Sequence, residues 1–215
     1  MSSESGYIPE SPEQSPFNNK GIFTPTDIYD LTRADKWTQF GQMNLLLTTN
    51  VTSNVSTLDF TSIDQYGFYD IFCIILNDIT IENNNKLMGL ELLSDGVASG
   101  TGYQVTSMVQ QSNGTFTDVK GTNYPAMRVT DNCGSDTNEV ANSIIYVYNA
   151  LDSSKYTHIT YHGLYQTEAN VQGSEFGSGC LPETRMDNGF RFHPDQNGST
   201  NFTGGNFSLY GMEMT

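Results

Sequence analysis

The chain has 215 residues and a net charge of −15, from 24 acidic and 9 basic side chains. This balance argues against a nucleic-acid partner, because nucleic-acid affinity depends largely on Lys and Arg at phosphates. The longest apolar run, IFCIIL at 71–76, is far shorter than the roughly 20 residues of a membrane-spanning helix, so we also expect no membrane partner.

The first 20 residues are mostly Ser, Glu, Pro, Gln and Asn. They contain neither the basic start nor the apolar run of a secretory signal, so we expect the protein to be made and kept in the cytoplasm. This composition buries too little apolar surface to offset its own ordering entropy. We therefore expect an extended N-terminal arm that becomes ordered only against a partner, and we divide the chain into an arm, 1–40, and a body, 41–215.

A short helix is predicted within the arm, at TPTDIYDLTR, which begins at Thr24. Thr24 suits the cap, Pro25 suits the first helical position, and Asp27 favours the helix dipole. Two to three turns are not stable without packing, and Ile28 and Leu31 supply an apolar face. Two interpretations stay open: the helix closes one end of its own body, or it fixes the arm against a neighbouring subunit.

From about Gln42 the pattern changes to strands, rich in aromatic and β-branched residues and separated by Asn-, Asp- and Gly-containing turns. The predicted strands are MNLLLT (43–48), FYDIFCIILNDITI (68–81), KLMGLELL (86–93), SIIYVYNA (143–150), KYTHITYHGLY (155–165), FRFH (190–193) and NFSLYGM (206–212). The continuous apolar run at 71–76 indicates a central strand covered on both faces, and 155–165 alternates between two faces. Residues 98–142 indicate long loops or edge strands, with short strand candidates at 102–109 and 126–130. We expect an all-β protein in which the body is an antiparallel two-sheet sandwich.

The candidate chemical groups do not combine into a recognisable site. His158 and His162 would be about 13 Å apart on one strand, too far to bind one metal ion, and His193 is on another strand. The loop Asp131–Glu139 lacks the regular spacing of a calcium loop, so a polar loop is the favoured interpretation and calcium binding stays open. A reactive cysteine needs positively charged surroundings, and this chain has few basic residues. Its three cysteines therefore do not indicate a nucleophile. We expect no catalytic residue, metal ion or cofactor, and not an enzyme.

One stretch resembles a known family. The run KGIFTPTDIYDLTRADKW, at 20–37, resembles an arm motif of structural proteins of tailed bacteriophages, of the cyanophage and marine phage type. The segment YGFYDIFCIILNDITIENNNKLMGLELLSDG (66–96) is similar to their paired sandwich strands, and NFSLYGMEM (206–214) to their terminal strand. These matches cover a minority of the chain.

The resemblance implies a jelly-roll virion protein without catalysis. The absence of heptads and repeats favours a compact capsid decoration or cement protein over a fibre. We expect it to stabilise the outer surface of the head as a homotrimer, with the major capsid protein and itself as partners. The alternative is a tail or collar appendage, in which a host surface glycan would be the partner. The residues expected to anchor the arm between subunits are Phe17, Ile22, Phe23, Ile28, Tyr29, Leu31 and Trp37.

Overall fold

The structure is a computed structural model, and it describes residues 14–15, 18–19, 25–26, 29, 33, 43–195 and 198–213. The chain divides into two compact units, residues 1–42 and residues 43–215.

The N-terminal unit contains one small antiparallel pair, β1 (Gln14–Ser15) with β2 (Asn18–Asn19). At the four positions of the predicted helix that the structure describes, Pro25, Thr26, Tyr29 and Arg33, the backbone is helical. The bounds of this helix lie outside the described residues. The Arg33 guanidinium carbon lies 5.6 Å from the centroid of the Tyr29 ring, as expected for side chains four apart on a helix.

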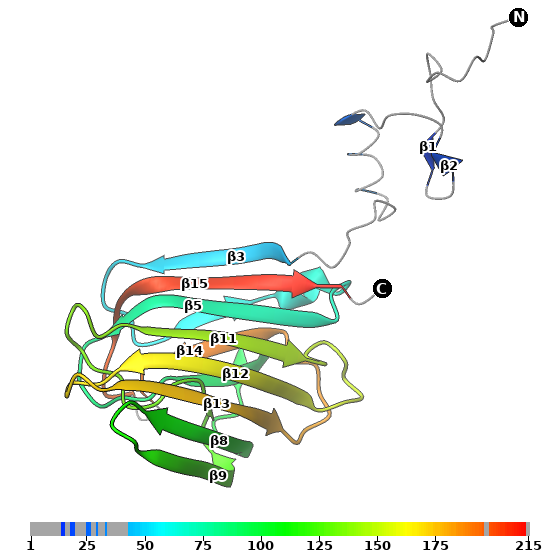
Figure 1. The fold of residues 1–215 in the computed structure, drawn as a ribbon. Helices are drawn as coiled ribbons and strands as arrows, with labels where there is room; N and C mark the ends of the chain where they lie inside the picture. The colour runs from blue at the N-terminus through cyan, green and yellow to red at the C-terminus, as the bar shows by residue number, and fades with distance from the viewer. Residues whose placement is uncertain are drawn as a thin grey trace, which may run out of the picture. The chain divides into compact units, whose positions relative to one another are not determined.

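The second unit contains two antiparallel sheets, of eight and five strands, so the predicted all-β two-sheet sandwich is confirmed (Figure 1). The larger sheet has the order β3 (Asn44–Val51), β15 (Phe202–Met212), β5 (Ile71–Ile81), β11 (Ala141–Tyr148), β12 (Thr157–Gln166), β13 (Gln172–Leu181), β8 (Tyr103–Gln111) and β9 (Phe116–Tyr124). The smaller sheet has the order β10 (Met127–Arg128), β6 (Gly89–Ser94), β14 (Gly189–His193) and β4 (Leu58–Thr61), and β7 (Val97–Ala98) pairs with β6. A 3-10 turn, η1, spans Ile63–Tyr66. Nowhere in the described residues is there a helix with the length and apolarity needed to cross a membrane.

Eight of these strands have jelly-roll connectivity. In chain order they are β3, β4, β5, β6, β10, β11, β14 and β15. The first pairs with the last (β3 with β15), the second with the seventh (β4 with β14), the third with the sixth (β5 with β11) and the fourth with the fifth (β6 with β10). This is a long hairpin rolled into two facing sheets, the arrangement of a jelly roll.

The remaining four long strands extend the larger sheet beyond β11. The hairpin β8–β9 is inserted between β7 and β10, and the hairpin β12–β13 is inserted between β11 and β14. The two insertions meet where β13 pairs with β8, so that β12, β13, β8 and β9 form one continuous extension of the sheet (Figure 1). We call these four strands the extension.

The core lies between the two sheets and is rich in phenylalanine. Among the described residues it draws on positions 46 to 209 of the chain. The Phe207 ring lies 5.4 Å from that of Phe192 and 5.1 Å from that of Phe202, in tilted and edge-to-face contacts. All three side chains are fully buried. Aromatic pairs of this kind contribute beyond the area that they bury.

Three features differ from the sequence-based expectation. Residues 58–61 and 172–181, which the pattern does not mark as strands, form β4 and β13, whereas β9 is an edge strand, one of the two forms expected for residues 98–142. The central strand β5 is confirmed, but its outer face is only partly covered, since Ile71 and Ile75 are half-buried. On the same face Cys73 is fully buried and lies opposite Tyr146 and Tyr210 of the neighbouring strands.

Candidate functional site

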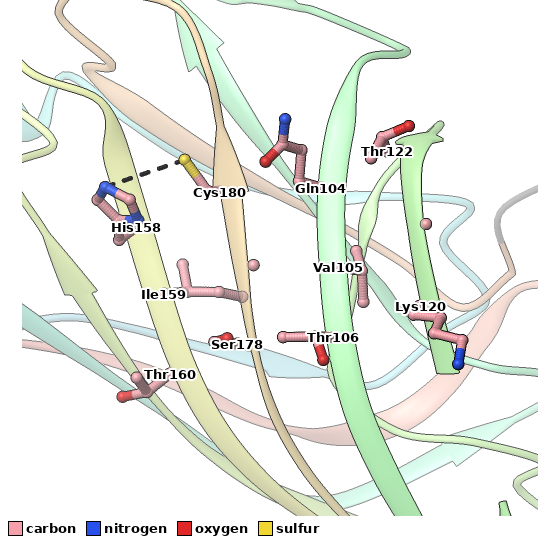
Figure 2. A pocket seen from close by; sticks show the side chains of 12 residues that line it. Gln104, Val105, Thr106, Lys120, Thr122, His158, Ile159, Thr160, Ser178 and Cys180 are labelled. Atoms are coloured by element: carbon pink, nitrogen blue, oxygen red, sulfur yellow. Dashed lines mark hydrogen bonds between the residues drawn. The ribbon is translucent and has the colours of Figure 1, made fainter. Parts of the chain in front are cut away.

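An open groove lies on the outer face of the extension (Figure 2). Its volume is about 470 Å³, within the range of roughly 300–1,000 Å³ that is usual for small-ligand sites. Polar side chains from all four strands line it: Gln104, Thr106, Lys120, Thr122, His158, Thr160, Ser178 and Cys180.

Alternation along the strands places these side chains outward. Along β8 and β12 the residues are buried and exposed in turn. Val105 and Ile159 belong to the core, whereas Thr106 and His158 beside them are exposed. Because successive side chains of a strand point to opposite faces, the same sequences build the core on one side and the groove on the other.

Strand pairing arranges part of the groove as a straight polar row. Thr160 lies opposite Ser178, Ser178 opposite Thr106, and Thr106 opposite Lys120. The row crosses four strands, so three inter-strand spacings, about 14 Å, separate its two ends. Each threonine places a methyl group beside its hydroxyl, so the groove wall offers apolar and hydrogen-bonding atoms in alternation.

A thiol and an imidazole lie side by side at one end of the groove. The Sγ atom of Cys180 is 4.0 Å from Nε2 of His158, its directly opposed neighbour on β12 (Figure 2). Burial raises the pKa of the Cys180 thiol above its ordinary value, so the thiol stays protonated near neutral pH, whereas the thiolate is the nucleophile. In the described part of the chain no carboxylate orients the His158 ring. The pair is therefore suited to hydrogen bonding with a ligand rather than to nucleophilic attack.

Lys120 gives the groove its positive charge. The other basic side chains of the sandwich, Lys86, Arg128, Lys155, Arg185 and Arg191, each form an ion pair with a carboxylate. Over residues 43–195 and 198–213, Lys120 alone among the lysines and arginines has no such pair. Within the described sandwich, the one lysine or arginine without an ion pair therefore lines the groove.

A buried polar network lies on the inner face of the same strands. Glu175 of β13 is fully buried, and its Oε1 atom accepts hydrogen bonds from the hydroxyls of Ser107 (2.6 Å) and Tyr161 (2.8 Å) and from Nε of Arg128 (3.1 Å). Arg128 also pairs with Asp131 at 2.6 Å. Burial lowers the pKa of Arg128, but the two carboxylates outweigh it and raise the pKa overall. Because every charge has a partner, this network supports the extension rather than binding a ligand.

The histidines lie in three different settings. His158 lines the groove, and His162 lies further along β12, 2.9 Å from the hydroxyl of Ser174. His193 is on the smaller sheet and pairs with Glu91. The expectation that these histidines hold no metal ion stays a prediction. In the described ranges no three His, Cys, Asp or Glu side chains gather in a way that could hold a metal ion.

Calcium binding stayed open for the acidic loop Asp131–Glu139. Two carboxylates of this loop contact other groups of the protein. Asp131 pairs with Arg128, and Oε2 of Glu139 accepts a hydrogen bond of 3.0 Å from the backbone N–H of Asp136.

The predicted arm-anchoring residues fall almost entirely outside the described part of the chain. Tyr29 is described and is 61% exposed. The others lie outside the described residues: Phe17, Ile22, Phe23, Ile28, Leu31 and Trp37. Their predicted role therefore stays a prediction.

The sequence-based reasoning missed both the groove and the buried network. Cys180 and His158 are 22 residues apart, and only the register of β12 on β13 brings them together. A signal was present in the alternation of Tyr156 to Leu164, which marks His158 and Thr160 as outward neighbours. Neither a protein-family model nor a curated protein matches this chain.

Proposed function

We propose that this chain is a non-enzymatic structural protein of a tailed-bacteriophage virion, and that it decorates and stabilises the outer surface of the capsid. The observation that carries the proposal is the jelly-roll connectivity of the eight strands, the architecture that the resemblance of the arm motif implies. Fold alone does not assign function, so the proposal rests on this architecture together with the motif at 20–37.

The arm has apolar side chains of its own, among them Ile28, Leu31 and Trp37. We propose that these side chains bind a surface of another subunit. A 20-residue tail extended at about 3.4 Å per residue would reach on the order of 60 Å, enough to cross a junction between capsid subunits. We propose that the arm binds the major capsid protein and neighbouring copies in a homotrimer.

Truncation tests this proposal. A chain without residues 1–40 should retain its far-UV circular dichroism and cooperative unfolding, because the core is intact, but should lose binding to capsids prepared without the protein. The double variant Ile28→Asp with Leu31→Asp keeps the chain length and should weaken the same binding. Unchanged capsid binding by a folded truncated chain would contradict the role of the arm.

Labelling intact particles separates the two locations. A decoration protein would be found in many copies over the shell, whereas a tail or collar appendage would be found in few copies at one vertex. The second outcome would replace the capsid role with the appendage role.

A further inference from the structure

We propose that the groove on the extension is a binding site for an oligosaccharide that carries a carboxylate. The proposal rests on three observations: the polar row across four strands, an exposed aromatic ring beside the groove, and the unpaired cation at the far end of the row. It goes beyond the assembly role, since it requires only the folded sandwich.

The aromatic ring belongs to Tyr156. A second hollow, of about 440 Å³, is lined by Tyr156, Lys155 and Thr184 and shares His158 with the groove. The Tyr156 side chain is 44% exposed, so part of its ring is available to a ligand. The carbon-bound hydrogens of a sugar ring pack against an aromatic face, and the tyrosine hydroxyl remains free to hydrogen bond.

The polar row supplies hydrogen bonds for sugar hydroxyls. Thr160, Ser178 and Thr106 present hydroxyls that both donate and accept, at intervals of one strand spacing, about 4.8 Å. A second row runs beside it, in which Cys180 lies opposite both His158 and Gln104, and these two add imidazole and amide groups. A row of this kind, with methyl groups between the hydroxyls, matches a molecule that has hydroxyls and carbon-bound hydrogens on every ring.

Lys120 selects the charge of the ligand. It lines the groove at the opposite end of the row from Thr160, and it is the lysine without an ion pair in the described sandwich (Figure 2). Long polyanions such as nucleic acids would meet the overall charge of −15, whereas a single carboxylate at Lys120 gains an attraction at short range. A uronate-containing oligosaccharide combines that one charge with many hydroxyls.

A peptide is less well suited to this face. A bound peptide strand needs unpaired backbone N–H and C=O groups at a sheet edge, and the strands beneath the groove, β12, β13 and β8, are each paired on both sides. Lys120 lies on the edge strand β9, and a charge on an edge strand also discourages pairing with other chains. The two uses of Lys120 predict different effects of its removal, and the experiment below separates them.

The test applies the full-length protein to an array of uronate-containing oligosaccharides and their neutral counterparts with the same linkages. We expect at least one uronate-containing oligosaccharide to bind, about tenfold or more tightly than its neutral counterpart. Lys120→Met should remove that preference while the protein stays monodisperse, and Tyr156→Ala should weaken binding of the charged and neutral forms alike. The matched control is Phe116→Ala, an exposed residue of the same strand as Lys120 that does not line the groove.

The outcomes decide the proposal. Loss of the preference for the charged form in Lys120→Met, and weaker binding of both forms in Tyr156→Ala, with Phe116→Ala unchanged, would support it. No binding to any oligosaccharide of the array, or binding that neither variant weakens, would overturn it. Aggregation of Lys120→Met without a change in the binding of its monomeric fraction would assign Lys120 to edge protection and also overturn it.

Discussion

Phenylalanine rings fill the space between the sheets of the jelly roll, whereas the inner face of the extension holds a buried ion pair and hydroxyl groups among its apolar side chains. In the jelly roll, Phe192, Phe202 and Phe207 pack ring against ring with no exposure. Beneath the extension, Glu175 and Arg128 form a buried ion pair. The outer faces differ as well, because all the residues that line the groove belong to strands of the extension. The comparison assigns most of the stability to the jelly roll and the recognition chemistry to the inserted strands.

The largest effect on stability is expected in the jelly roll. Phe207→Ala removes a fully buried ring that touches two others, so the free energy of unfolding should fall by about 4 kcal/mol. Chemical denaturation followed by far-UV circular dichroism measures this change. The matched control is Phe116→Ala on β9, where the side chain is 67% exposed and the expected change is within about 0.5 kcal/mol. Equal losses in the two variants would contradict the assignment of stability to the jelly roll.

A smaller loss is expected at the buried ion pair that joins Glu175 of the extension to Arg128 of β10. Glu175→Gln keeps the shape of the side chain but removes its charge, which should cost about 3 kcal/mol of unfolding free energy. The loss is limited because Arg128 keeps its second partner, Asp131, at 2.6 Å. The same denaturation experiment measures it.

A double variant sharpens this prediction. Replacing Arg128 by Met together with Glu175→Gln removes both charges of the pair and should cost less than Arg128→Met alone. The single variant leaves the fully buried Glu175 carboxylate without its partner, whereas Asp131 loses Arg128 in both variants. If the double variant is less stable than the single one, the ion pair itself stabilises the extension, and the comparison with the dry aromatic core fails.

The jelly roll was more predictable than the extension for a physical reason. Its strands carry long apolar or alternating runs, as in β5 and β11, and such patterns depend only on local sequence. The strand β13 contains Gly173, Gly177 and Gly179, which have low intrinsic strand preference. Glycine is required there by packing: a Cβ atom on Gly179 would lie 2.7 Å from Cγ of Met127 in the smaller sheet. That contact joins residues 52 positions apart, and no local pattern announces it.

The candidate site was hidden for a related reason. Outward positions on β12 could be read from alternation, which placed His158 and Thr160 on one face. Their partners Ser178 and Cys180 required the register of β13, a strand that the pattern does not predict. The absence of an ion pair at Lys120 could not be inferred either, because it depends on where every carboxylate of the fold lies.

The smallest expected effect concerns the alkylation of the three cysteines, which is measured without any change in stability. Burial raises the pKa of Cys73 to about 11 and that of Cys133 to about 12, and both thiols are buried. Cys180 is partly exposed in the groove. Iodoacetamide should therefore alkylate Cys180 alone in the folded protein and all three thiols after unfolding, as mass mapping would show.

The pH dependence of that labelling tests the chemistry of the groove. Because burial raises the pKa of the Cys180 thiol above its ordinary value, the thiolate fraction should rise about tenfold between pH 7 and 8, without a plateau in that range. His158→Ala should change the rate little, since burial and not the imidazole is the cause of the shift. A plateau below pH 8 that disappears in His158→Ala would show that the imidazole activates the thiol, and the groove would then have to be treated as a catalytic site rather than a binding site.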